Sequence, residues 1–188
     1  MYTKNVDSVE SLTFGSILAS NVEAELPQTN TTNNENVNDS NPTIEEDVYE
    51  FSIYIPKIGL KKNIIPYVSP VEESEYLDVI EKNVAHGKYT FTPERTNKLN
   101  WGITYLFAHR EGNSGFFNRL GELNTGDRIE INFNGKKYIY SLTSKYIVDP
   151  SQTEVYSSYH PTPLLRIQTC ENGLSQRLIV DSALISVE

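Results

Sequence analysis

Two side chains in the C-terminal part of the chain have the types and the spacing that thiol chemistry requires. Cys170 is the only cysteine, and Arg177 follows it seven residues later. The flanking segments "LLRIQTC" and "QRLIVDS" have the alternating pattern that is typical of β-strands. If the intervening residues form a hairpin loop, the thiol and the guanidinium oppose each other, with Cβ atoms about 4.5–5.5 Å apart. A cation at this position favours the reactive thiolate.

A cysteine nucleophile usually works with a group that transfers protons. The chain has three histidines, His86, His109 and His160. His109 ends the apolar segment "YLFAH" and leads into the polar "REGNSG", and strand ends that border loops often carry catalytic groups. His86 and His160 lie in segments, "VAHG" and "YHPTP", that are typical of turns or of the surface. His109 is therefore the candidate general acid and base.

Each of these residues also has an ordinary structural interpretation. A lone cysteine in a strand is most often a small buried apolar residue. A histidine at a strand end is more often structural than catalytic, and an arginine that begins a strand is usually solvated or paired with a carboxylate. Spacing alone therefore leaves both interpretations open.

The elements that must position these side chains are mainly strands. "DRIEINFNGKKYIYSLTSKYIV" predicts a hairpin with a type I′ turn at Asn134-Gly135. The segment "VEESEYLDVIEKN" has helical spacing, and "SGFFNRLGEL" predicts a helical turn. Further strands are predicted in "FSIYIPKIGL", "ITYLFAH", "PLLRIQTC" and "QRLIVDSALIS". Seven or eight short strands favour a closed or nearly closed β-barrel, because closure removes exposed strand edges.

The first quarter of the chain has a different composition. Residues 20–48 are rich in Asn, Thr and Glu and have few large apolar side chains, which predicts a flexible linker. We therefore expect a tail over 1–48 and a barrel domain over 49–188. No run of about 18 apolar residues is present, so no membrane-spanning helix is predicted. The apolar segment Leu12–Ala19 follows acidic residues, unlike the core of a signal peptide.

Charge and cysteine count exclude several classes of function. The net charge of −9 argues against a nucleic-acid partner, because such binding relies on Lys and Arg. One cysteine excludes an internal disulfide framework and a Cys-rich metal site. No loop has the oxygen-ligand pattern of an EF-hand, so no metal and no cofactor is expected.

Four segments in order resemble the sortase family. "IQTC" followed by "RLIV" is similar to the sortase cysteine and arginine strands, and "YLFAHRE" is similar to the histidine segment. "IPKIGL" resembles the opening barrel strand, and "FFNRLGELNTGDRIEI" the helical turn and the strand after it. There are two departures: Arg166-Ile167 stands where the family usually has Thr-Leu, and Ala108 where Gly commonly precedes the histidine.

The resemblance implies an eight-stranded sortase barrel with one or two short helices. It also implies a cysteine transpeptidase at the extracytoplasmic face of the bacterial membrane, held there by a segment absent from this chain. Such an enzyme cleaves a Leu-Pro-x-Thr-Gly-like sorting signal of a surface protein after Thr. The acyl group passes through a thioester to an amine of cell-wall peptide or a pilin.

The resemblance also implies a role for each site residue. Cys170 is the expected nucleophile, His109 the proton-transfer group and Arg177 the residue that orients the carbonyl and stabilises the oxyanion. The backbone N–H of Glu171 is a further oxyanion donor, and Thr169 shapes the site. By strand alternation Arg166 shares the face of Cys170, which predicts either a role in the substrate groove or simple solvation.

Two alternatives stay open. The tail contains Leu26-Pro27-Gln28-Thr29, followed by Asn30 where a sorting signal has Gly. Chance within an Asn/Thr-rich linker is the favoured explanation, and docking of the tail in its own groove, as an inhibitor or slow substrate, is the other.

The second alternative concerns function: a catalytically silent sortase-like module that binds sorting signals, which the joint presence of Cys170, His109 and Arg177 disfavours.

Overall fold

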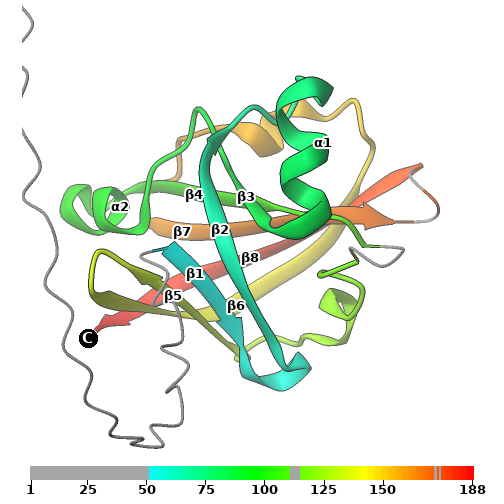
Figure 1. Cartoon of the computed structure of the whole chain (residues 1–188). Helices are drawn as coiled ribbons and strands as arrows, with labels where there is room; N and C mark the ends of the chain where they lie inside the picture. The colour runs from blue at the N-terminus through cyan, green and yellow to red at the C-terminus, as the bar shows by residue number, and fades with distance from the viewer. Residues whose placement is uncertain (1–50, 111–114, 172, 174) are drawn as a thin grey trace, which may run out of the picture. The chain divides into compact units, whose positions relative to one another are not determined.

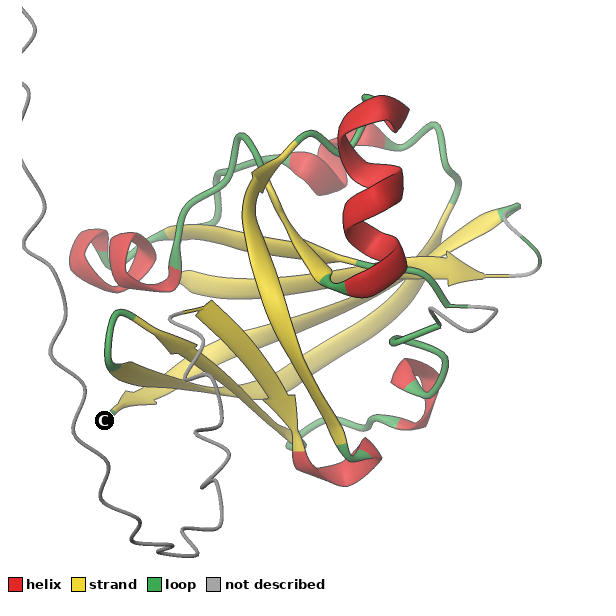
Figure 2. Cartoon of the chain, in the orientation of Figure 1, coloured by secondary structure: helices red, strands yellow, loops and turns green. Residues whose placement is uncertain are grey.

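Eight strands close into a barrel with the helices on its outside (Figures 1 and 2). The computed structural model describes residues 51–110, 115–171, 173 and 175–188. Around the barrel the strand order is β1-β2-β3-β4-β7-β8-β6-β5. The strands are β1 (Phe51–Ile55), β2 (Leu60–Val68), β3 (Val84–Gly87), β4 (Gly102–Phe107), β5 (Arg128–Phe133), β6 (Lys136–Val148), β7 (Pro163–Glu171) and β8 (Gln176–Val187).

The described residues contain two α-helices, α1 (Glu73–Lys82) and α2 (Pro93–Leu99), and three short 3-10 helices. The latter are η1 (Pro56–Ile58), η2 (Leu120–Glu122) and η3 (Thr153–Tyr156). The predicted eight-stranded barrel with one or two short helices is confirmed. The proposed boundary at residue 49 lies outside the described residues and stays a prediction.

The pattern analysis missed β3 and α2 for physical reasons. β3 has only four residues, so its alternation is too short to detect. α2 has no apolar stripe, since its buried residues are Pro93 and Thr96. Its start is set instead by Thr92, whose side chain accepts a hydrogen bond from the backbone N–H of Arg95.

The β5–β6 hairpin has the predicted turn. Asn134 and Gly135 have φ angles of 50° and 71°, and Phe133 pairs with Lys136 across the turn. A type I′ turn requires positive φ at both central residues, a conformation that Gly adopts freely and that Asn tolerates best among the other residues. This part of the fold follows from local sequence alone.

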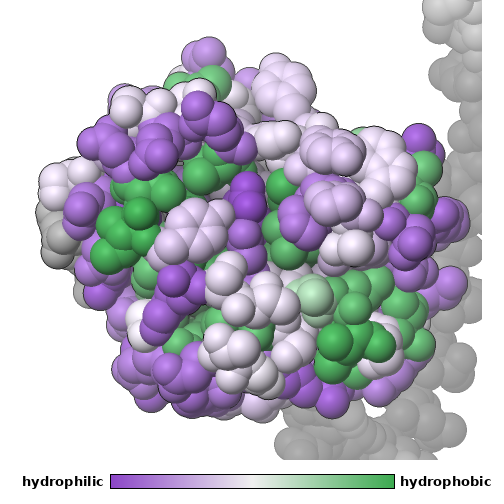
Figure 3. Space-filling view, turned by 180° about the vertical axis from the view of Figure 1, so that it is seen from behind, coloured by the Kyte–Doolittle hydropathy of each residue, from purple (hydrophilic) through white to green (hydrophobic). Residues whose placement is uncertain are grey.

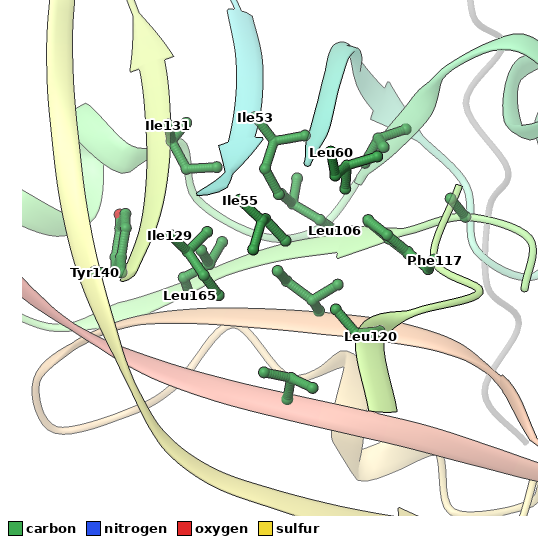
Figure 4. Packing of buried hydrophobic residues seen from close by; sticks show 14 of the residues in the cluster. Ile53, Ile55, Leu60, Leu106, Phe117, Leu120, Ile129, Ile131, Tyr140 and Leu165 are labelled. Atoms are coloured by element: carbon green, nitrogen blue, oxygen red, sulfur yellow. The ribbon is translucent and has the colours of Figure 1, made fainter. Parts of the chain in front are cut away.

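The barrel strands bury side chains on two faces. Inward-facing residues such as Ile53, Ile131 and Leu165 converge in the interior, as Figure 4 shows. The outer face of β3, β4 and β7 is also buried, because α1 and η3 cover it. There Ile80 and Tyr156 pack with Tyr105, and Gly87 leaves room for the Tyr105 ring, which a Cβ would meet at 2.5 Å. On the face opposite to that of Figure 1, apolar residues form separate patches among polar ones (Figure 3).

The prediction that His86 lies in a turn or at the surface is wrong. It is a fully buried residue of β3, in edge-to-face contact with Phe51 and Tyr67. Its Nε2 lies 3.1 Å from the carbonyl oxygen of Phe91, and its Nδ1 accepts a hydrogen bond from the backbone N–H of Tyr67 at 3.4 Å. These partners select the neutral ring with the proton on Nε2. Burial lowers the pKa of His86 to about 4.

This buried histidine predicts a pH-dependent stability. Because its pKa is lower in the folded than in the unfolded protein, the unfolded chain takes up the proton first as pH falls. We expect His86 to remove about 3 kcal/mol from the free energy of unfolding between pH 7 and pH 4. Urea denaturation across this range measures the loss, which should largely disappear in His86→Gln. The control is His160→Gln, which should keep the parental pH dependence. An equal dependence in His86→Gln would contradict the prediction.

Candidate active site

The parallel pairing of β4 with β7 brings the histidine segment to the cysteine segment. Pairs run from Gly102↔Pro163 to Phe107↔Gln168, so each β4 residue faces the β7 residue 61 positions later. Past the end of β4, the backbone N–H of Ala108 still donates to the carbonyl of Gln168 at 3.4 Å. The hydroxyl of Thr169 donates to the carbonyl of Ala108 at 3.0 Å. Extended two residues past Phe107, the same offset of 61 positions aligns His109 with Cys170 across the two neighbouring segments.

The β7–β8 pairing adds the third candidate residue. Cys170 pairs directly with Arg177 across the antiparallel ladder, as the spacing predicted. On β7, Leu165 and Ile167 belong to the barrel interior. Side chains alternate along a strand, so Gln168 and Cys170 lie on the outer face. The thiol and the guanidinium are therefore on the side of the barrel that α1 and η3 cover.

Cys170, His109 and Arg177 line a single cavity of about 320 Å³. The cavity lies between the ends of β4, β7 and β8 on one side and α1 and η3 on the other. Its other lining residues are Pro70, Glu73, Tyr76, Leu77, Ile80, Phe107, Ala108, Tyr156, Gln168 and Thr169. The three candidate side chains thus share a pocket whose opposite wall is mainly apolar.

Sequence reasoning missed the wall that α1 provides. The helical spacing of "VEESEYLDVIEKN" predicted this helix, but nothing in the sequence says what its apolar residues, such as Tyr76 and Ile80, cover. Burial raises the pKa of Tyr76, and the nearby carboxylate of Glu73 raises it further, while Arg177 opposes them. Tyr76 and Arg177 line the same cavity. Tyr156 of η3 was missed for the same reason.

Gln168 also lines the cavity. Strand alternation could have predicted this, because Gln168 lies two residues before Cys170 and so shares its face. Its side chain is largely buried, and its amide oxygen has no hydrogen-bond partner among the described residues. A buried acceptor without a partner is costly, so such atoms are often found at binding sites. Thr169, by contrast, is buried, and its hydroxyl donates to the carbonyl of Ala108; its role in shaping the site stays a prediction.

Comparison with known proteins decides the family. Residues 53–185 match the model of the Sortase domain, which is most of the chain. This chain belongs to the sortase family. It is 28% identical over 116 residues to Sortase D of Bacillus subtilis, and the chain spans about half (51%) of that protein's length. That match covers 62% of this chain.

Solved sortase structures have the same fold. A Clostridium perfringens Sortase D5 transpeptidase is 27% identical, with a TM-score of 0.62, over 73% of this chain and 79% of that one. Sortase E1 from Streptomyces coelicolor, solved with a tripeptide in the active site, has a TM-score of 0.63 at 21% identity. The match covers 74% of this sortase and 90% of that chain.

Arg166 of this sortase lies away from the pocket and packs into the outer face of the barrel. Its Nε and Nη2 donate to the two carboxylate oxygens of Asp181, both at 2.7 Å, and Nη1 donates to the carbonyl of Val155 at 3.2 Å. Burial alone would lower the pKa of Arg166, but the bonds and charge of Asp181 outweigh it and raise that pKa. Burial, with help from Asp181, raises the pKa of Tyr146 to about 12. Of the two interpretations of Arg166, this geometry supports neither: it is a structural ion pair.

The remaining site predictions stay predictions. Glu171 lies at the end of β7, and its carboxylate forms an ion pair with Arg110. The motif Leu26-Pro27-Gln28-Thr29 lies outside the described residues. Within the described ranges, no three His, Cys, Asp or Glu side chains gather as metal ligands.

The ion pair of Arg166 predicts a large effect on stability. The two side chains are 12% and 11% exposed, so Asp181→Ala leaves a buried cation without its partner. We expect the free energy of unfolding to fall by about 3–5 kcal/mol, measured by urea denaturation. The matched control is Lys98→Ala, which removes an exposed pair with Glu94 and should cost less than about 1 kcal/mol. Equal losses in the two variants would show that Arg166 is not held as described.

Proposed function

We propose that this sortase is a cysteine transpeptidase that cleaves a Leu-Pro-x-Thr-Gly-like sorting signal after Thr and transfers the acyl group to an amine. The observation that carries the proposal is the cavity lined jointly by Cys170, His109 and Arg177. A nucleophile, a proton-transfer group and a cation around one space are what acyl transfer requires. The transpeptidase from Clostridium perfringens, which shares the fold at 27% identity, supports the same reaction class.

The first half of the proposed reaction forms the acyl-enzyme. The thiolate of Cys170 attacks the carbonyl carbon of the Thr–Gly bond, and the carbonyl oxygen takes on negative charge. Arg177, opposite Cys170 in the ladder, stabilises this oxyanion, and the backbone N–H of Glu171 is a second donor. His109 then donates a proton to the leaving glycine amine, and a thioester with Thr remains on Cys170.

The second half releases the product to the acceptor. An amine attacks the thioester carbon, and His109, now deprotonated, takes up the proton that the attacking nitrogen loses. The C–S bond breaks, the new amide bond forms, and the thiolate of Cys170 is regenerated. Water in place of the amine gives hydrolysis, so the balance between the products depends on the acceptor that is present.

The shape of the cavity fits the apolar part of such a signal. Leu77, Ile80 and Phe107 form an apolar wall beside the reacting groups. The Leu and Pro side chains of a sorting signal lie before the scissile bond and would bury apolar surface against this wall. The unsatisfied amide oxygen of Gln168 offers an acceptor for a substrate N–H or hydroxyl.

The family also suggests partners and a place of action. We propose surface proteins that carry a sorting signal as donors, and an amine of cell-wall peptide or of a pilin as acceptor. The corresponding location is the extracytoplasmic face of the bacterial membrane. Among the described residues, no helix combines the length and the apolar composition needed to cross a membrane.

The decisive experiment identifies the nucleophile and the reaction together. A fluorogenic Leu-Pro-x-Thr-Gly peptide is incubated with the protein, with and without triglycine, and mass spectrometry follows the adduct and the ligated product. We expect a thioester on Cys170 and transfer to triglycine, both lost in Cys170→Ala. The assay is repeated with residues 1–45 deleted and with a peptide library, which also tests docking of the tail. Binding of peptides without any adduct in these assays would replace the proposal by the silent binding module.

The role of Arg177 predicts a selective loss of rate. Arg177→Ala removes a charged donor to the oxyanion, so kcat/KM for peptide cleavage should fall about 10²–10³-fold. Arg177→Lys should recover part of this loss, because the positive charge stays but the planar fork does not. Thermal unfolding serves as the control for folding. Unchanged kcat/KM in a folded Arg177→Ala would remove this residue from the mechanism.

A further inference from the structure

The residues that directly follow the two reacting side chains carry opposite charges and touch. Arg110 follows His109, and Glu171 follows Cys170. The guanidinium of Arg110 donates to the carboxylate of Glu171 in an ion pair whose side chains are only 26% and 18% exposed. Neither residue lines the cavity that holds the thiol. The two side chains therefore lie next to the reacting groups and take no part in the bond changes themselves.

This ion pair continues a regular pattern. Thr169 bonds to Ala108 and Glu171 pairs with Arg110, in both cases 61 positions apart, the offset of the β4–β7 ladder. The two contacts lie one residue before and one residue after the level of Cys170 and His109. They bracket the reacting pair from the two sides along the strands.

These two contacts lie just past the point where the backbone pairing of β4 with β7 ends. β4 stops at Phe107, so His109 is beyond the last paired strand residue. Its carbonyl accepts a bond from the backbone N–H of Phe117 at 3.1 Å, which ties it to the loop that follows rather than to β7. Cys170 in turn is next to the last residue of its strand. Contacts outside the β4–β7 backbone pairing must therefore keep the segment of His109 aligned with that of Cys170.

We propose that Arg110 and Glu171 form a clamp that holds His109 and Cys170 at one level for proton transfer, an inference that rests on the proposed function. The clamp is made by the two side chains, which position the reacting groups and do not touch substrate; the oxyanion donor at Glu171 is its backbone N–H, which substitution by Ala or Arg keeps. Catalysis is sensitive to such positioning, since a displacement of about 1 Å can cost roughly 10²-fold in rate. The clamp also has an electrostatic consequence, because Arg110 neutralises a carboxylate that would otherwise disfavour a thiolate at the neighbouring residue.

The test uses the unique cysteine as its own reporter. Iodoacetamide alkylation of Cys170 is followed against pH in the full chain and in the variants Arg110→Ala and Glu171→Ala, together with kcat for peptide cleavage. Both variants should lose about tenfold or more in kcat with little change in KM. The midpoint of the alkylation profile should move up in Arg110→Ala, which leaves the carboxylate alone, and down in Glu171→Ala, which leaves the cation.

The exchange variant, Arg110→Glu with Glu171→Arg, is the critical control. It restores the pair with reversed polarity and should recover kcat to within about threefold of the unsubstituted protein. Arg128→Ala, which removes the ion pair with Glu130 on β5, should change neither rate nor profile. A shift of both midpoints in the same direction, or no recovery in the exchange variant, overturns the clamp. Alkylation needs no peptide substrate, so the midpoints judge the clamp even if the proposed transpeptidation fails.

Discussion

The parallel pairing of β4 with β7 is the constraint on which the site depends. These strands are far apart in sequence, and the chain forms β5 and β6 between them before it returns. A parallel pair cannot be closed by a tight turn, so its register must be set by packing on both faces. Both faces are indeed buried: Leu106 and Ile167 inside the barrel, Tyr105 and Phe107 beneath α1 and η3. A one-residue slip would move these side chains to the wrong face and separate His109 from Cys170.

The same alternation divides β7 into a side that faces the barrel interior and a side that faces outward. Its inward residues fill the barrel, whereas its outward residues run from the buried ion pair of Arg166 to the thiol of Cys170. Near the middle of the outer face, Arg166 is paired with the carboxylate of Asp181. At the end of the same face, Cys170 lines the cavity. Arg166 and Arg177 therefore differ in role although both lie on the outer face: the first is satisfied within the fold, and the second lines a cavity.

How much could be predicted from the sequence depends on how local the cause is. The Asn134-Gly135 turn and the pairing of Cys170 with Arg177 follow from short segments, and both were predicted correctly. The position of His109 opposite Cys170 depends on β4–β7 pairing over 61 positions, so the local pattern could name His109 as a candidate but could not place it beside the cysteine. His86 was misplaced because its burial depends on Phe51 and Tyr67, which a local pattern does not bring to it. Arg166 was left open although the register that pairs Cys170 with Arg177 also pairs Arg166 with Asp181, so this ion pair could have been predicted from the same hairpin.

The cavity that Cys170, His109 and Arg177 line has one wall formed by the barrel strands and an opposite wall formed by other elements. Cys170, Arg177 and the end of β4 belong to strands that the ladder and the barrel interior hold in place. The opposite wall comes from α1, a helix of ten residues with a single buried side chain, Ile80. Packing on the strands, rather than helix propensity, must therefore hold α1 in place. Changes in α1 should thus alter which peptide fits while they leave the reacting groups in register, because the register is set within the barrel.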